Sequence, residues 1–183
     1  CKVDLIIFAG SIPNYYGQAK VKELSIESIV VPFDDLGLAL SVLRASHSLP
    51  FNQISIDLPN QEQFLKLVRV AKIPGNLPFV KDFPWIYEWK EQQHELNLDE
   101  FIKFHLQLYE ERKTQLALTS IHAVYQELQK LDIPSSYMVV TNKSLIETLE
   151  RAVSTFKLKK IKESQIAVVS IQSSNEDIQR DLE

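Results

Sequence analysis

Small polar side chains follow several apolar runs of this sequence, at the points where a strand would give way to a helix. They come after three separate runs: Ser11, Thr119, Ser120, Thr141 and Asn142. Hydroxyl and amide groups donate and accept hydrogen bonds, so such a set suits the binding of a small polar or anionic molecule. Tyr15 and Tyr16 stand close behind Ser11, and we expect one of them to cover the ligand. Ser120 and Asn142 are explained equally well as helix caps, the commonest use of these residues.

Asp57 is the carboxylate that best suits a place at the same site, because it stands at the end of a predicted strand just before Pro59. As an alternative, it is an aspartate that forms the turn before the proline. Asp34 and Asp35 follow the end of another predicted strand, and we expect one of them to cap the next helix rather than to contact a ligand. An enzyme built on this chain would use Asp57 or Asp34 as its base, but the sequence shows no titratable pair that completes such a site.

The sequence lacks the motifs of several common kinds of site. Neither glycine-rich phosphate-binding pattern occurs among its four glycines. The four histidines are scattered without the spacing of metal ligands, and we expect His105 at the edge of a helix. No G-x-S-x-G nucleophile motif is present, and a single cysteine excludes an internal disulfide and a cysteine-rich metal site. We therefore expect no catalytic residue, no metal and no cofactor, and a binding protein rather than an enzyme.

Short β-rich apolar runs alternate with amphipathic segments along the chain, an order typical of parallel α/β units. Strands are predicted at residues 3–9, 29–33, 53–58, 116–118, 137–140 and 165–171. Helices are predicted around residues 36–43, 64–71, 98–109, 120–130 and 143–156, and a turn region at 10–17. We therefore expect a three-layer α/β fold with mostly parallel sheets, arranged as two similar Rossmann-like lobes.

The chain matches itself weakly when shifted by about 109 positions, so that Ser11 falls on Ser120 and Val30 on Val139. Any two βαβα units share such periodicity, so the alternative is one continuous sheet without a repeat. The predicted organisation is a first α/β lobe, an aromatic connection with a helix, a second α/β lobe and a polar tail, at residues 1–82, 83–113, 114–172 and 173–183. Ligands of parallel α/β sheets bind outside the carboxyl ends of the strands, which predicts a cleft between the lobes.

Two segments carry side chains that suggest a partner surface. Aromatic residues crowd into residues 83–89, where they serve as a partner surface or ligand lid, or else as a buried plug at a hinge. Lysines at 157–162 form a brief basic cluster without interleaved aromatic residues, and we expect a solvated turn rather than a contact with nucleic acid.

The composition of the 183 residues is that of an ordinary globular domain, with 45% hydrophobic and 24% charged residues. The net charge of −4 excludes a chain-wide basic field for nucleic acid. No stretch approaches the roughly 20 apolar residues of a membrane span, so we expect a soluble, cytoplasmic chain without a membrane partner. Because Cys1 comes directly before the first predicted strand, we also expect the chain to be a piece of a longer protein.

The stretch from Val3 to Tyr15 resembles the "DxxxFxGxxPY"-type segment of uncharacterised bacterial multidomain regulators. The stretch from Leu116 to Ile121, with Tyr125 and Thr141, resembles a later segment of the same proteins. More distantly, the arrangement resembles the two-lobed amino-terminal sensor domain of propionate-type transcription activators. The resemblance implies a sensory domain joined to an output domain, and it supplies no ligand.

The sequence therefore favours an effector-binding sensory domain of a bacterial signalling or transcription regulator, with a small polar or anionic metabolite as its ligand. A homodimer is an open possibility, and contact with nucleic acid would come only through a domain outside this chain. Two alternatives stay open. One is a protein-interaction or dimerisation module built on residues 83–109, and the other is an enzyme on the same Rossmann-like scaffold.

Overall fold

The computed structural model describes residues 3–47, 49–72, 75–88 and 94–163. Its strands are β1 (Leu5–Phe8), β2 (Glu27–Val30), β3 (Ile54–Leu58), β4 (Phe79–Asp82), β5 (Leu116–Thr119) and β6 (Ser135–Tyr137). Its helices are α1 (Ser11–Glu23), α2 (Asp35–Ser46), α3 (Gln61–Ala71), α4 (Leu98–Glu110), α5 (His122–Lys130) and α6 (Asn142–Glu163). Two short 3-10 helices are η1 (Phe51–Gln53) and η2 (Pro84–Tyr87).

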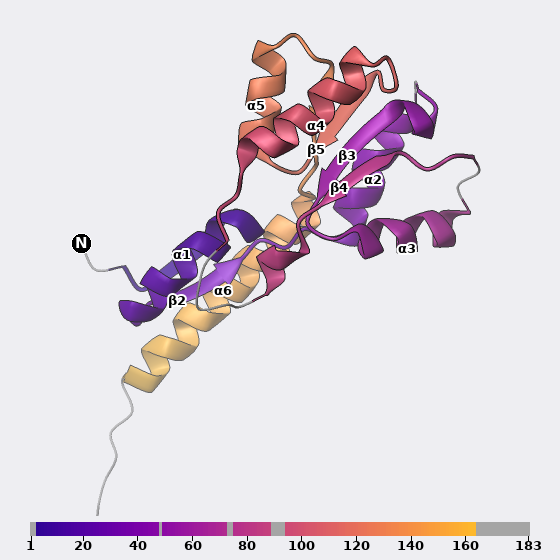
Figure 1. Ribbon diagram of the computed structural model, residues 1–183. Helices are drawn as coiled ribbons and strands as arrows, with labels where there is room; N and C mark the ends of the chain where they lie inside the picture. Colours follow the sequence, from indigo (N-terminus) through magenta and orange to yellow (C-terminus); the bar gives the residue numbers. More distant parts are fainter. Residues whose placement is uncertain (1–2, 48, 73–74, 89–93, 164–183) are drawn as a thin grey trace, which may run out of the picture.

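The strands form two separate parallel sheets. One has two strands, β1 and β2, and the other has four in the order β4-β3-β5-β6. We call β1, α1, β2 and the carboxyl-terminal part of α6 the small lobe, and β3 to β6 with α2 to α5 the large lobe (Figure 1). The expected α/β fold with parallel sheets is confirmed.

Strand β3 is the centre of the large lobe, and all five of its residues are buried. Successive side chains of a strand point to opposite faces of the sheet. Ile54, Ile56 and Leu58 accordingly pack with α2 and α3 on one face. Ser55 and Asp57 point to the other face, where α4 covers them. The large lobe is thus three-layered, with α2 and α3 on one side of the sheet and α4 and α5 on the other.

A second core joins the two lobes. Tyr15 of α1 packs there with buried residues of the large lobe, including Phe83, Phe101 and Val124. The ring of Tyr15 meets Trp85 edge-on at 5.2 Å, and the ring of Phe83 meets Phe101 edge-on at 5.4 Å. The aromatic residues of 83–89 that the structure describes are therefore mostly core residues, and among them Tyr87 is exposed.

Several elements differ from their predicted bounds. Helix α1 begins at Ser11 instead of following a turn region, because Gly10 makes the turn alone with a φ of 141°. Strand β6 ends at Tyr137, since the amide of Ile121, which would continue the ladder to Met138, donates to the side chain of Thr119 instead. Helix α6 continues to Glu163, so the basic residues at 157–162 lie on a helix rather than in a turn.

The division into lobes also differs from the predicted boundaries. Strands β3 and β4 fall within residues 1–82, the predicted first lobe, but they pair into the sheet that holds β5 and β6. The predicted strand at 165–171 and the polar tail at 173–183 lie outside the described residues. Within the described part of the chain, none of the helices has the length and apolar character needed to span a bilayer.

Candidate ligand-binding site

A cavity of about 540 Å³ lies between the two lobes, where the strands of both sheets end. The small lobe contributes residues just after β1 and β2, such as Gly10 and Val31. The large lobe contributes residues just after β3, β5 and β6, among them Pro59, Ser120 and Met138. This is the carboxyl edge of both parallel sheets, the usual place for a ligand in such folds.

Two helices of different lobes point their first turns at this cavity. Ser11 and Ile12 begin α1, His122 and Ala123 begin α5, and all four residues line the cavity wall. Neither helix has a side-chain cap. The first N–H groups of a helix lack intrahelical acceptors and carry the positive end of its dipole. A ligand with a hydrogen-bond acceptor or a negative charge would therefore accept hydrogen bonds from the first N–H groups of both helices.

Helices whose first turns lie away from the cavity are capped in the ordinary way. Asp34 accepts a hydrogen bond from the amide of Gly37 at the start of α2. Asn60 accepts one from the amide of Glu62 at the start of α3, and Thr141 accepts one from Ser144 at the start of α6. Helix α4 also lacks a side-chain cap, and its first residue, Leu98, lines the cavity too, so the missing caps of α1, α4 and α5 coincide with the wall of the cavity.

Most of the cavity wall is apolar. Its polar side chains are those of Ser11, Ser120, His122 and Tyr137, and the remaining lining residues are Gly10 and aliphatic, proline or aromatic residues. Among the described residues, no lysine, arginine, aspartate or glutamate lines it. Helix ends supply only partial charges, so the wall suits a small ligand with at most one negative charge and an apolar body.

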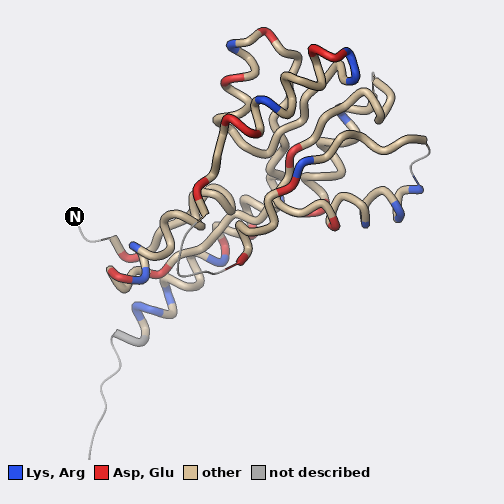
Figure 2. The backbone as a smooth tube through the Cα atoms, in the orientation of Figure 1, with Lys and Arg blue, Asp and Glu red and all other residues tan. Residues whose placement is uncertain are grey.

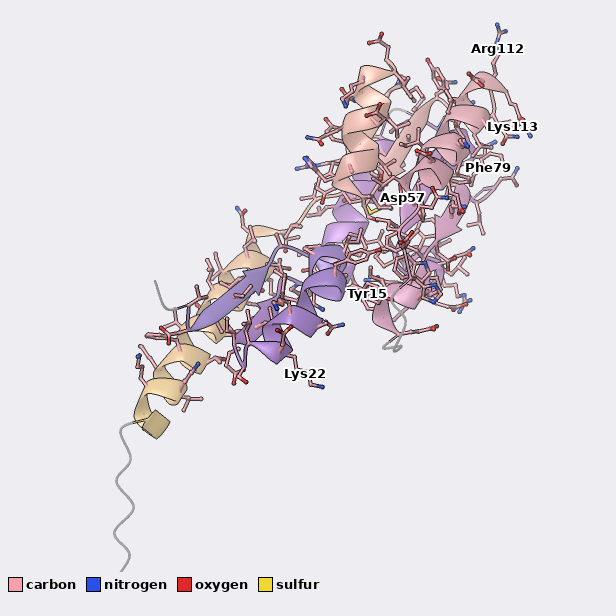
Figure 3. All side chains as sticks on the ribbon, turned by 60° about the vertical axis from the view of Figure 1, so that its left-hand side comes forward. Tyr15, Lys22, Asp57, Phe79, Arg112 and Lys113 are labelled. Atoms are coloured by element: carbon pink, nitrogen blue, oxygen red, sulfur yellow. The ribbon has the colours of Figure 1, made fainter. Side chains whose placement is uncertain are left out.

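A buried hydrogen-bond chain lies directly behind Ser120. The Asp57 carboxylate accepts two bonds from Ser120, from the amide at 2.9 Å and from the hydroxyl at 3.0 Å. Its other oxygen lies 2.9 Å from Nε2 of His105, and Nδ1 of His105 lies 2.7 Å from the hydroxyl of Ser55. Ser55, Asp57 and His105 are all completely buried, and Figure 3 shows Asp57 inside the molecule while Lys22 and Arg112 project outward.

One placement of protons satisfies the whole chain. When Nε2 of His105 carries a proton and Nδ1 does not, Ser55 donates to Nδ1, Nε2–H donates to Asp57, and Ser120 donates twice to the same carboxylate. The hydroxyl proton of Ser120 then points away from the cavity, toward Asp57. Its oxygen is left as an acceptor for a ligand, so this part of the wall selects a hydrogen-bond donor.

The same residues contain a Ser–His–Asp set, but their geometry does not form a nucleophilic site. Ser55 contacts the histidine, yet its side chain is completely buried in β3 and is not part of the cavity wall. Ser120 does line the cavity, and it bonds to Asp57 rather than to His105. A substrate in the cavity would therefore meet a serine whose hydroxyl bonds to a carboxylate and not to the imidazole of His105.

Tyr137 and His122 form the wall of the cavity next to β6. Their rings meet edge-on at 5.3 Å. Burial raises the pKa of the Tyr137 hydroxyl above its ordinary value of 10.0, and the negative charge of Asp57 raises it further. The Tyr137 hydroxyl therefore keeps its proton at neutral pH and can donate to a ligand.

Among the predicted site residues, Ser11 and Ser120 are brought together on the cavity wall. Tyr15 and Tyr16 instead hold the segment that precedes α4. The amide of His94 donates to the Tyr15 hydroxyl at 2.9 Å, and Tyr16 donates to the His94 carbonyl at 2.9 Å while accepting from the amide of Leu96 at 2.7 Å. Since Leu96 lines the cavity, the two tyrosines position its wall instead of covering its mouth.

The other predicted residues have structural partners or lie on the surface. Thr119 is completely buried and accepts a bond from the amide of Ile121 at 3.0 Å. Thr141 caps α6, and Asn142 is exposed at the start of that helix. Among the described residues, the cavity wall does not include Asp57, Thr119, Thr141 or Asn142.

Sequence reasoning missed His122 and Tyr137, and it placed His105 wrongly at a helix edge. His122 and Tyr137 stand at or after strand ends as Ser120 does, and that position is the signal that could have found them. His105 is completely buried on α4. His105 stands at helical spacing among the apolar residues of α4. A polar residue in such a position is expected to be buried and to have a hydrogen-bond partner, here on the sheet.

Asp34 forms hydrogen bonds between the two segments that connect the lobes. It precedes α2, and its carboxylate also accepts bonds from the hydroxyls of Thr141 and Ser144 at the start of α6. Burial raises the pKa of the Asp34 carboxyl, but these hydrogen bonds and the charge of Lys143 lower it by more. The pKa therefore lies below its ordinary value of 3.8.

Replacing Asp34 with alanine is expected to lower the free energy of unfolding by about 1–2 kcal/mol at pH 7. A carboxyl with a depressed pKa stabilises the folded state above its unfolded pKa, and this contribution disappears as the pH falls through the folded value. The difference between variant and wild type should therefore shrink below about pH 3.8. Urea unfolding at pH 7, 5 and 3 measures it, with the exposed neighbour Asp35→Ala as the control. A difference that is unchanged at pH 3 would contradict the assignment.

Comparison with known proteins gives no match to a family model, a curated protein or a solved structure. The fold and the site define the class of the chain as a parallel α/β protein with a cavity between two lobes.

Proposed function

We propose that this chain is an effector-binding sensory domain of a bacterial signalling or transcription regulator. A small polar or anionic metabolite binds in the cavity between the lobes. The observation that carries this proposal is that the uncapped first turns of α1 and α5, from different lobes, meet on one cavity of about 540 Å³. That volume lies within the range of small-molecule sites.

The wall chemistry narrows the ligand class. The free amides of α1 favour a carboxylate or another acceptor group, while the acceptor oxygen of Ser120 favours a hydroxyl, amide or ammonium group. The surrounding aliphatic and aromatic wall favours an apolar carbon skeleton. The ligand that fits all three is a small monocarboxylate with one hydrogen-bond donor and a short apolar body.

Signalling follows from the two-lobed construction. Ser11 belongs to the small lobe and Ser120 to the large lobe, so one ligand contacts both. A ligand that makes more of these contacts when the lobes are close together shifts the population toward the closed state. The connections near Asp34 and Thr141, which share hydrogen bonds, are the segments that would bend.

The contacts of the candidate bases favour binding over an enzymatic function. Asp57 is enclosed by Ser120 and His105, and Asp34 is engaged at the start of α2. Within the described part of the chain, neither carboxylate lines the cavity.

The proposal is tested by thermal-shift measurements with a panel of probes. The panel contains acetate, butyrate, lactate and leucine, each paired with the amide that lacks its carboxylate charge. Binding of a probe at 100 times its dissociation constant stabilises the folded chain by about 2.7 kcal/mol. We expect stabilisation by at least one carboxylate that carries a donor group and less by its amide. If no compound of the panel stabilises the chain, the proposed function is wrong.

A matched pair of variants separates charge from bulk. Ser11→Glu places a negative charge at the start of α1, where it favours the helix but repels an anionic ligand. Ser11→Gln adds the same bulk without charge. We expect both variants to fold with wild-type stability or better, and Ser11→Glu to lose stabilisation by the carboxylate that Ser11→Gln partly retains. Equal binding to wild type and Ser11→Glu would place the ligand elsewhere.

A further inference from the structure

Helix α6 presents an exposed apolar stripe that the two lobes do not use. We call Ile146, Leu149, Val153 and Phe156 the α6 stripe; their side chains are 55%, 54%, 52% and 38% exposed. A surface hollow beside the stripe is lined, among the described residues, only by residues of α6 itself. Scattered exposed apolar residues are ordinary, but a continuous exposed apolar surface usually marks an interaction site.

The face of α6 that packs on its own chain is small and polar. Ser144, Thr148 and Ala152 are its buried residues, and the helix contacts β1 and β2 of the small lobe. At 3.6 residues per turn the α6 stripe lies about a third of a turn away from this face. The helix therefore buries its small and polar side chains within the chain and leaves its larger apolar side chains outside.

The spacing of the α6 stripe is that of a helix-pairing surface. The steps between its members are three, four and three residues. Apolar residues in alternating steps of three and four keep one seam facing a partner helix, as in coiled coils. The 22 residues of α6 correspond to a length of about 33 Å, enough for several layers of such packing.

The charges along α6 indicate what its partner is. Figure 2 shows lysines gathered toward the carboxyl-terminal end of the helix, where Lys157, Lys159 and Lys160 lie. Glu150 stands seven residues before Lys157 on the outer edge of the stripe. Two copies of α6 in parallel would bring the lysines together. In the antiparallel arrangement, the lysine-rich half of each helix lies along the amino-terminal half of the other, where Glu147 and Glu150 outnumber Lys143.

We propose that a second copy of this chain packs antiparallel against the α6 stripe and forms a two-fold symmetric dimer. Leu149 then packs on Val153 of the second copy, and Ile146 on Phe156 of the second copy. A two-fold interface uses the same surface on both chains, which the single stripe provides. This inference does not depend on the proposed ligand or its cavity.

Size-exclusion chromatography with light scattering tests the association. We expect the intact chain to show twice its mass of 21.1 kDa. Leu149→Glu places two like charges near the symmetry axis and should raise the dissociation constant of the dimer by about 100-fold or more. The control is Leu43→Glu on α2, a leucine that is 64% exposed outside the stripe, and it should remain dimeric. A monomeric wild type, or a dimeric Leu149→Glu variant, overturns the proposal.

Disulfide cross-linking tests the antiparallel orientation. Leu149→Cys and Val153→Cys are made separately in a Cys1→Ser background, and the two proteins are mixed under mild oxidation. An antiparallel pair joins Leu149→Cys to Val153→Cys, whereas two Leu149→Cys residues lie about four residues, or about 6 Å, apart along the axis. Faster cross-linking of Leu149→Cys with itself would overturn the antiparallel arrangement.

Discussion

Replacing Asp57 with alanine is expected to lower the free energy of unfolding by about 3–5 kcal/mol. Asp57 is completely buried and accepts bonds from Ser120 and His105. Alanine leaves the amide of Ser120 and Nε2–H of the completely buried His105 without their acceptor. Unpaired buried donors cost far more than the net gain of the bonds that they formed. Urea unfolding at pH 7, followed by circular dichroism, measures the loss.

A second variant keeps the Asp57 prediction testable if alanine prevents folding. Asp57→Asn preserves the shape, and its amide oxygen still accepts both bonds from Ser120. Its amide nitrogen is then a donor toward His105, which must place its own proton on Nδ1. We expect a loss of about 1–2 kcal/mol, clearly less than for alanine. If alanine and asparagine cost the same, unpaired donors are not the reason for the loss.

The fold was predictable because its signals are local. The apolar run at residues 53–58 identified β3, and Asp34 caps α2 as expected. The division into lobes was not predictable in this way. Strand β3 pairs with β5, about 60 residues further along the chain. The apolar sequence of a strand does not indicate which sheet the strand joins. Sequence order therefore placed β3 and β4 with the wrong neighbours.

The candidate site was predictable only as far as strand ends define it. Ser11 and Ser120 follow β1 and β5, and parallel sheets bring those ends to one edge. Thr119 stands one residue before Ser120, and that single step decides whether a hydroxyl meets the cavity or bonds its own backbone. Asp57 and His105 are 48 residues apart, so their pairing depends on how α4 packs on the sheet.

Replacing Phe83 with alanine is the second change with a large expected effect, about 3–5 kcal/mol of the free energy of unfolding. Phe83 is 1% exposed and packs edge-on with Phe101 in the core that joins the lobes. It also lines the cavity between the lobes. Truncation therefore removes packing from that core and enlarges the cavity at the same time.

Two comparisons separate this account of Phe83 from a general intolerance of the aromatic segment. Tyr87 lies four residues later and is 55% exposed, so Tyr87→Ala should change the free energy of unfolding by less than about 0.5 kcal/mol. A cavity left by an aromatic ring in an apolar wall binds small apolar molecules. Benzene should therefore raise the unfolding temperature of Phe83→Ala more than that of wild type. Equal losses in both variants, or no response to benzene, would mean that Phe83 does not join the two lobes as its contacts indicate.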